Sequence, residues 1–249
     1  MIILKVLGAH SPFCNKEQAC PSYLIKKDKT QILLDCGSGS HRFFDMKNLN
    51  GLQIFISHLH KDHFNDIFNY LYSSIVLKNQ GIVKDKLKVY LPEFEGDISN
   101  IIKSEPNAYA DYFEINENKE YVIGDFKIYF CKLVHSHQVE MYAIKLKTEN
   151  MCIVYSGDVS YSSKDKLIKF SKNADILICE ASLLKEHNFP KVCAHLTASQ
   201  TAEIAKLSGV KKLVLTHFWP DEHKNKYLNE AKEIFDNVIL AEEAKEIIL

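Results

Sequence analysis

Three histidines and an aspartate lie within six residues of the chain, where they could bind a metal ion together. The run SHLHKDHF contains His58, His60, Asp62 and His63. Neutral imidazoles and carboxylates are ligands that suit zinc and related divalent ions. A solvated polar loop after a strand would not need this spacing, and the H-x-H-x-D-H pattern is specific among short motifs. The run therefore predicts a metal site, with Asp62 also a candidate catalytic carboxylate.

Further histidine and aspartate residues follow apolar runs elsewhere in the chain. The SGD run after CIVYS supplies Asp158, and the THF run after KLVLT supplies His217. His135 and His137 lie between two more runs of strand length. A polar cap at a strand end would explain any one of these residues. Three such positions beside H-x-H-x-D-H instead indicate that they complete a metal cluster.

The hydrophobic pattern predicts the elements that must position these residues. Runs with the length and composition of strands cover residues 2–7, 22–27, 31–35, 53–57, 86–91, 126–133, 141–147, 152–156, 175–179, 212–216 and 237–241. Helical periodicity is strongest over residues 65–79, 95–104, 198–208 and 224–236. Thr197 and Gln200 predict a capping box for the third of these helices, which Gly209 ends. No repeat or linker divides the chain. We therefore predict one α/β domain over residues 1–249, an αββα sandwich of two mixed sheets packed face to face with helices outside.

The segment 104–120 is polar but contains Tyr109, Tyr112 and Phe113. Its composition predicts a surface loop with a short strand. A lid over a site, or a dimer contact, remains the alternative for this segment.

The composition of the chain argues against a polyanionic partner, a disulfide framework, secretion and membrane insertion. The 249 residues carry a formal net charge of −1 and one arginine, Arg42, so no basic surface for a long polyanion is predicted. The seven cysteines are scattered without a C-x-x-C pair, which is typical of reduced thiols. The start, MIILKVLG, lacks the features of a signal peptide, and no apolar stretch reaches the length of a membrane span. These observations predict a cytoplasmic protein.

A set of motifs along the chain resembles one known family. The motifs are LGAHSPFC, LLDCGSGS, SHLHKDH, HQVEMYAIKL, YSGD, CEAS, AHLTASQTAEIA and LTHF. Over essentially its whole length, the chain resembles metallo-β-lactamase-fold hydrolases. It is most similar to the branch that holds the tRNA 3′-processing endonuclease ribonuclease Z and cyclic-nucleotide phosphodiesterases. Compact members of this branch include phage anti-Pycsar proteins, which destroy cyclic-nucleotide defence signals.

The resemblance implies a role for each matching residue. One divalent ion, zinc or manganese, would be bound by His58, His60 and His137, where the spacing to Glu140 and Tyr142 selects His137 over His135. A second ion would be bound by Asp62, His63 and His217, with Asp158 bridging the two. Asp35 would orient a ligand imidazole, and His195 with Glu180 would lie near the substrate phosphate without binding metal. Two such ions can activate a water and hold phosphoryl oxygens, and His195 could protonate the leaving oxygen.

The spacing of the motifs favours a small substrate. Ribonuclease Z carries a long arm for tRNA between its third histidine motif and its SGD motif, whereas 20 residues separate His137 from Asp158 here. The resemblance therefore implies a phosphodiesterase that converts a 3′,5′-cyclic nucleotide to the 5′-monophosphate, with no stable nucleic-acid complex. It also implies a homodimer. Candidate base contacts are Tyr142, Phe218, Trp219 and the segment 109–113. A ribonuclease Z-type endonuclease, a hydrolase of lactones or thioesters, and an inactive metal-binding relative remain the alternatives.

Overall fold

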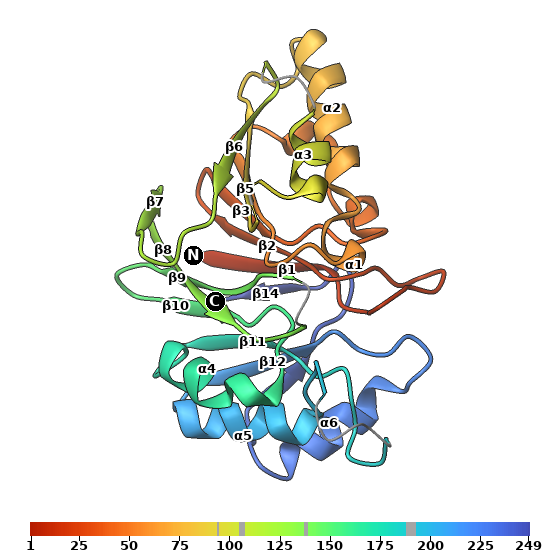
Figure 1. Cartoon of the computed structure of the whole chain (residues 1–249), viewed down its shortest axis with the longest axis vertical. Helices are drawn as coiled ribbons and strands as arrows, with labels where there is room; N and C mark the ends of the chain where they lie inside the picture. The colour runs from red at the N-terminus through yellow and green to blue at the C-terminus, as the bar shows by residue number, and fades with distance from the viewer. Residues whose placement is uncertain (94, 105–107, 137–138, 188–192) are drawn as a thin grey trace. The chain divides into compact units, whose positions relative to one another are not determined.

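The chain folds into two compact units, each of which contains one sheet. The structure is a computed structural model that describes residues 1–93, 95–104, 108–136, 139–187 and 193–249. The first unit comprises residues 1–115 and 242–249, and the second comprises residues 116–241. Each unit has a mixed seven-stranded sheet with helices beside it (Figure 1). The predicted pair of mixed sheets with flanking helices is confirmed, while the single domain over residues 1–249 stays a prediction.

The sheet of the first unit changes from antiparallel to parallel pairing at its centre. Its strands, in order across the sheet, are β14 (Glu246–Ile248), β1 (Ile2–Gly8), β2 (Ser22–Lys27), β3 (Thr30–Leu34), β4 (Leu52–Phe55), β5 (Leu87–Leu91) and β6 (Ala110–Glu114). Pairing is antiparallel from β14 to β3 and parallel from β3 to β6. Because β3 and β4 are parallel neighbours, the residues that follow them, Asp35 and His58 among them, lie at the same edge of the sheet.

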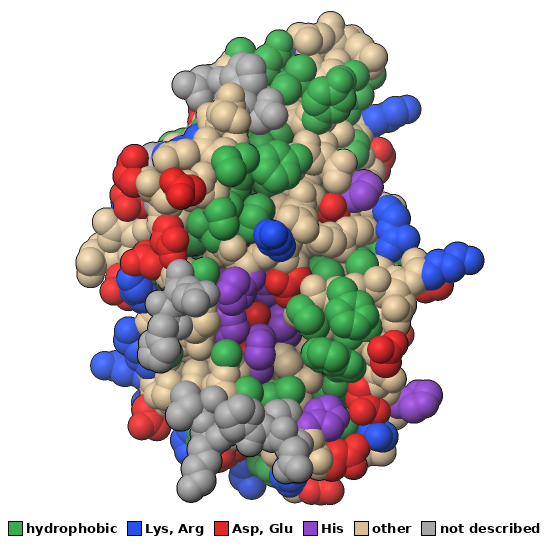
Figure 2. All heavy atoms as spheres, turned by 45° about the vertical axis from the view of Figure 1, so that its right-hand side comes forward, with side chains coloured by type: hydrophobic (Ala, Val, Ile, Leu, Met, Phe, Trp, Pro, Cys, Tyr) green, Lys and Arg blue, Asp and Glu red, His purple; other side chains and the backbone are tan. Residues whose placement is uncertain are grey.

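The helices of the first unit pack one face on this sheet. They are α1 (Lys61–Phe64), α2 (Ile67–Asn79) and α3 (Asp97–Lys103), and two 3₁₀ turns, η1 (Ser40–Phe43) and η2 (Met46–Asn48), precede them. The inner face of α2 adds Ile67, Tyr70 and Leu71 to the hydrophobic core. Its outer face exposes Phe68, Tyr72 and Val76, and Figure 2 shows hydrophobic side chains gathered over α2 and α3.

The sheet of the second unit also combines parallel and antiparallel pairing. Its strands, in order across the sheet, are β13 (Val238–Leu240), β12 (Lys212–Thr216), β11 (Ile176–Glu180), β10 (Cys152–Tyr155), β9 (Met141–Lys147), β8 (Phe126–Leu133) and β7 (Tyr121–Ile123). Pairing is parallel from β13 to β10 and antiparallel from β10 to β7. The carboxyl ends of the three parallel neighbours β10, β11 and β12 lead to Asp158, Glu180 and His217.

The helices of the second unit include the predicted capped helix. They are α4 (Lys164–Phe170), α5 (Ala198–Ser208) and α6 (Lys224–Lys232), and the 3₁₀ turn η3 (Tyr161–Ser163) precedes α4. Thr197 and Gln200 form the capping box of α5, and Gly209 ends the helix with φ +67°, as predicted. α5 packs against β11 and β12 and against α6 (Figure 1). Its capped start follows directly on His195 and thereby fixes the position of this residue.

Most predicted elements are present, and the differences are short elements. The strand predicted within the segment 104–120 is confirmed as β6, although residues 105–107 lie outside the described residues. The sequence did not predict β7, β14, α1 or α4. The described residues include no helix with the length and hydropathy that a membrane crossing requires. All seven cysteines are free thiols, and three of them, Cys20, Cys36 and Cys179, are buried.

Candidate metal centre

The H-x-H-x-D-H run of the first unit spans the turn between β4 and α1. β4 ends at Phe55, and His60 is the N-terminal cap of α1, which carries Asp62 and His63. The rings of His58 and His63 have centroids 4.1 Å apart, and Nε2 of His58 lies 3.1 Å from Nδ1 of His60. The structure therefore brings the three predicted ligand histidines of this unit together.

Asp35 organises this group from the end of β3. Asp35 has φ +58°, which is a left-handed backbone conformation. Oδ2 lies 2.7 Å from Nδ1 of His63 and accepts a hydrogen bond from Oγ of Ser57 at 2.8 Å. The fully buried carboxylate of Asp35 accepts hydrogen bonds, so Nδ1 of His63 is the donor and Nε2 keeps its lone pair for a cation. This geometry suits the predicted role of Asp35, which is to orient a ligand imidazole.

Asp62 has two neighbours that the motif did not indicate. Oγ of Ser11 donates a hydrogen bond to Oδ2 of Asp62 at 2.6 Å. A Cβ atom on Gly37 would lie 2.0 Å from the carbonyl oxygen of Asp62, so only glycine allows this close approach. The loop that follows β3 is therefore packed directly on the turn that carries Asp62.

In the second unit, Asp158 and His217 lie side by side. Nε2 of His217 is 3.0 Å from Oδ1 of Asp158, and both side chains are buried. His217 has φ +65°, so the chain turns sharply after β12. Its Nδ1 lies 2.7 Å from Oγ of Ser182, a residue that sequence reasoning missed. With Nδ1 bonded to this oxygen, Nε2 is the ring nitrogen that faces the carboxylate.

Glu180, which is buried, and His195, which is partly exposed, form an acid–base pair beside them. Nδ1 of His195 lies 3.1 Å from Oε1 of Glu180, which also accepts a hydrogen bond from the backbone N–H of Val159 at 2.7 Å. Burial by itself would lower the pKa of His195, but the charge and the hydrogen bond of Glu180 outweigh burial and raise this pKa above its usual value. The same contact lowers the pKa of Glu180 although burial would raise it. The pair therefore consists of a carboxylate and a histidine, and this histidine holds a proton at neutral pH more readily than a free histidine side chain does.

The third histidine motif is described only in part. His137, the predicted ligand, lies outside the described residues. His135 is buried, its Nδ1 lies 2.9 Å from the carbonyl oxygen of Ala194, and its Nε2 lies 3.8 Å from Oδ2 of Asp158. This is the arrangement of a ligand histidine, so His135 becomes a candidate beside His137.

Each unit has side chains that suit divalent ions. His58, His63, His135 and His217 each have Nδ1 near an oxygen of the protein, from Ser57, Asp35, Ala194 and Ser182 respectively. In metal-binding histidines, a hydrogen bond at Nδ1 fixes the tautomer and leaves Nε2 to bind the metal. Together with Asp62 and Asp158, these donors match the imidazole and carboxylate preference of zinc.

Three of the predicted substrate contacts, Phe218, Tyr142 and Trp219, differ in the exposure of their side chains. Phe218 is fully buried, and its ring centroid lies 5.0 Å from that of Tyr227, so its side chain offers no surface to a ligand. Tyr142 is 7% exposed and donates a hydrogen bond to Glu140. Trp219 is 43% exposed. Of these three residues, Trp219 has the accessible aromatic ring, and it is kept as a proposed contact.

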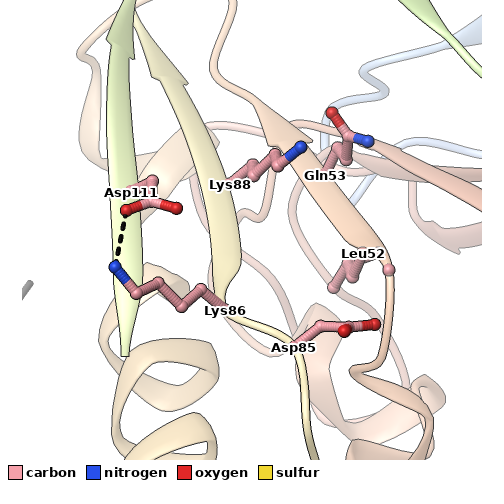
Figure 3. Close-up of a pocket in the computed structure, with 7 residues that line it drawn as sticks. Leu52, Gln53, Asp85, Lys86, Lys88 and Asp111 are labelled. Atoms are coloured by element: carbon pink, nitrogen blue, oxygen red, sulfur yellow. Dashed lines mark hydrogen bonds and ion pairs between the residues drawn. The ribbon is translucent and has the colours of Figure 1, made fainter. Parts of the chain in front are cut away.

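A separate hollow in the first unit lacks the groups of an active site. It has a volume of about 300 Å³ and lies at the amino ends of β4, β5 and β6, whereas His58 follows the carboxyl end of β4 (Figure 3). Lys86 and Asp111 form an ion pair at 2.9 Å beside it. Its charged lining residues, Asp85, Lys86, Lys88 and Asp111, have balanced charge, and none of its lining residues is a histidine or cysteine.

Known proteins resemble this chain over nearly its full length. The family model for the beta-lactamase superfamily domain matches residues 30–218. The probable metallo-hydrolase YhfI of Bacillus subtilis is 27% identical over 236 residues, which cover 94% of each chain. The crystal structure of YhfI superposes with a TM-score of 0.88 at 26% identity and covers 99% of this chain and 98% of that one. Ribonuclease Z of Methanosarcina mazei is 27% identical over 306 residues, which cover 99% of this chain and 97% of the relative.

The extent of the family match agrees with the grouping of histidine and aspartate side chains in each unit. The match includes every histidine of the H-x-H-x-D-H run as well as Asp158 and His217. The chain belongs to the beta-lactamase superfamily and is a metal-dependent hydrolase of the metallo-β-lactamase fold.

Proposed function

We propose that the chain is a dinuclear-metal phosphodiesterase that hydrolyses a 3′,5′-cyclic nucleotide to the 5′-monophosphate. The observation that carries the proposal is the His195–Glu180 pair beside the Asp158–His217 pair, because it joins a proton donor to metal ligands at one sheet edge. In this proposal, removal of a cyclic-nucleotide immune signal is the biological role, and the cytoplasm is the location.

The proposed ligands are the histidine and aspartate residues that the sequence motifs and the histidine geometry identify within each unit. The first unit contributes His58, His60, Asp62 and His63, and the second contributes Asp158, His217 and one of His135 and His137. Two zinc or manganese ions bound by these groups supply Lewis acidity toward a phosphoryl oxygen and an activated water. The binding of metal by the isolated protein can be measured without any substrate.

The proposed acid is His195. Because Glu180 holds Nδ1 of His195, Nε2 is the ring nitrogen left to deliver a proton to the leaving oxygen. The side chain of His195 is 29% exposed, whereas that of Glu180 is 1% exposed. A substrate can therefore reach the histidine, while the carboxylate that holds it stays out of water.

The compact build of the chain supports a small substrate. The interval between His137 and Asp158 is occupied by β9 and β10, an antiparallel pair, as predicted. The match to ribonuclease Z runs over 306 residues although this chain has 249, so that relative carries insertions. The match to YhfI runs over 236 residues and needs none of comparable size.

A homodimer is part of the proposal. The exposed apolar side chains Phe68, Tyr72 and Val76 share one face of α2 and offer a surface for a second copy. Light scattering should give twice the mass of the chain, 28.6 kDa.

The test of function is hydrolysis of a substrate panel by the metal-loaded protein. The panel contains cyclic mononucleotides, cyclic dinucleotides, bis-p-nitrophenyl phosphate, a lactone, a thioester and a tRNA precursor. We expect turnover of a cyclic mononucleotide with release of the 5′-monophosphate. Removal of the tRNA 3′ trailer without turnover of any cyclic nucleotide would replace this proposal with a ribonuclease Z activity, which the 27% identity to that enzyme makes the second candidate.

A further inference from the structure

One serine hydroxyl in the second unit contacts both a proposed metal ligand and the carboxylate that holds the proposed acid. Oγ of Ser182 lies 2.7 Å from Nδ1 of His217 and 2.7 Å from Oε2 of Glu180. It also lies 3.2 Å from Nδ1 of His195. Ser182 is 6% exposed and Glu180 is 1% exposed, so these hydrogen bonds form in a buried setting where they are strong.

The number of protons decides which group donates in each contact. A hydroxyl has one proton and can accept two hydrogen bonds, whereas an ionised carboxylate only accepts. The proton of Ser182 therefore goes to Glu180, and the oxygen of Ser182 accepts from the Nδ1–H of His217. This assignment leaves the lone pair of His217 on Nε2, the atom that lies 3.0 Å from Oδ1 of Asp158.

The first unit contains the same arrangement, built from different residues. Oγ of Ser57 donates to Oδ2 of Asp35 at 2.8 Å and lies 3.1 Å from Nδ1 of His58. Asp35 in turn contacts His63 directly, as Glu180 contacts His195. Each buried carboxylate thus holds one histidine directly and a second one through a serine. The two arrangements differ in one respect, because only Glu180 serves a proposed proton donor.

We infer that Ser182 is a positioning residue that fixes the tautomer of His217 for metal binding and holds Glu180 for the acid His195. The inference rests on the proposed function and extends it to a residue outside the ligand set. Loss of this one hydroxyl should therefore affect metal affinity and turnover together, although Ser182 itself touches neither metal nor substrate.

The test compares four variants of the full chain. Ser182→Ala removes the hydroxyl, Ser182→Thr restores it, and Ser57→Ala removes the corresponding hydroxyl of the first unit. Ser208→Ala is the matched control, because the Ser208 hydroxyl is equally buried and bonds Ser171 and the carbonyl of Ile204 instead of a histidine. Zinc affinity is measured on metal-free protein by competition with a chromophoric chelator. Turnover of the best cyclic mononucleotide of the panel, whose leaving oxygen must gain a proton, is measured at saturating zinc, and thermal unfolding monitors the fold.

We expect Ser182→Ala to weaken zinc binding about 10- to 100-fold, the usual effect of removing a partner of a ligand histidine. At saturating zinc its kcat should fall on the order of tenfold, less than the 10²–10⁴ that a proton donor itself contributes, with KM little changed. Ser182→Thr should recover both quantities to within a few-fold. Ser57→Ala should weaken zinc binding, and Ser208→Ala should leave zinc binding and turnover unchanged.

Two results would overturn the inference, and they differ in what else they overturn. If wild-type protein binds zinc but Ser182→Ala matches it in affinity and kcat, only the role of Ser182 is refuted. Failure of Ser182→Thr to recover function while it keeps the wild-type unfolding temperature has the same meaning. If wild-type protein binds no zinc or manganese, the proposed function fails as well.

Discussion

Nδ1 of His63 lies 2.7 Å from Oδ2 of Asp35, although 28 positions separate the two residues in the chain. The contact forms because β3 and β4 are parallel neighbours, so the loops that follow them meet. Asp35 reaches the histidine from a left-handed backbone conformation, which asparagine tolerates nearly as well as aspartate. The substitution Asp35→Asn therefore removes the charge without imposing new backbone strain.

We expect Asp35→Asn to weaken metal binding about 10- to 100-fold, because the amide no longer fixes His63 with Nδ1 as the donor. Zinc titration of the metal-free protein measures this loss. The matched control is Asp66→Asn, since Asp66 makes a similar contact of 2.9 Å with Nδ1 of His41 outside the proposed ligand set. An equal loss of affinity in both variants would mean that the effect comes from the fold and not from His63.

The third histidine ligand gives a second prediction, which compares His135 with His137. Sequence spacing selects His137, whereas the structure places Nε2 of His135 3.8 Å from Oδ2 of Asp158. Of the two variants His135→Ala and His137→Ala, the one that removes the ligand should lower the metal content of purified protein from close to two ions per chain. The other should keep its metal. Elemental analysis decides between them, and retention of both ions in both variants would remove this motif from the ligand set.

Gly37 gives a third prediction, which concerns the close packing behind Asp62. In Gly37→Ala, the new Cβ would lie 2.0 Å from the carbonyl oxygen of Asp62 and 2.7 Å from Cβ of Cys20, so the backbone must move. We expect a loss of stability of about 1–3 kcal/mol, as for other overpacked sites, together with weaker metal binding. Gly81→Ala is the control, because nothing lies within 4 Å of its Cβ position and only its φ of +73° imposes strain. Denaturant unfolding and zinc titration of both variants separate the two effects.

The elements around the site could be predicted from the sequence because buried parallel strands have continuous apolar runs. KLVLT and CIVYS match β12 and β10 almost residue for residue, and the residues after them are the site residues. β7 and β14 have three residues each, too few for a period-two pattern to be distinct from a loop. α4 has seven residues and begins directly after a 3₁₀ turn, and the side chain of its N-cap residue Ser163 makes no capping hydrogen bond.

The partners of the ligands could not be predicted in the same way. Ser182 and Ser57 are ordinary residues in the sequence, and their roles depend on hydrogen bonds to side chains that are set by tertiary structure. The left-handed conformations of Asp35 and His217 also leave no local signal, because neither residue is a glycine. Phe218 illustrates the same limit. The sequence predicts an aromatic residue after a strand end, but it does not show that the ring packs on Tyr227.

The acid–base pair gives a fourth prediction, which concerns pH. His195 must carry a proton to act as an acid, so activity should fall as the pH rises through its pKa. Glu180 raises that pKa. In Glu180→Gln the charge is lost, and the alkaline limb of the kcat profile should move to lower pH while both metals are retained. Glu203→Gln is the control, because Glu203 contacts Lys164 and Tyr161 instead of a histidine. An unshifted alkaline limb in Glu180→Gln would assign the proton to another group.

The substitution His195→Ala removes the proposed acid of the same pair. It should keep both metals and lose about 10²–10⁴ in kcat, the usual contribution of a positioned proton donor. Loss of metal from His195→Ala would make this histidine a ligand and would contradict the proposed roles.

Trp219 and Phe218 are adjacent aromatic residues with opposite expected effects. Stacking of a base on an accessible aromatic ring contributes about 1–3 kcal/mol, so Trp219→Ala should raise KM about 5- to 150-fold and leave the unfolding temperature unchanged. Phe218 is fully buried, so Phe218→Ala should cost about 3–5 kcal/mol of stability by leaving a cavity beside Tyr227. Tyr72→Ala controls for the loss of an exposed aromatic, since Tyr72 lies on the outer face of α2 and is 68% exposed. KM for the best cyclic nucleotide and the unfolding midpoint are measured for all three variants. An unchanged KM in Trp219→Ala would show that the base is bound elsewhere, while the hydrolytic groups would remain as assigned.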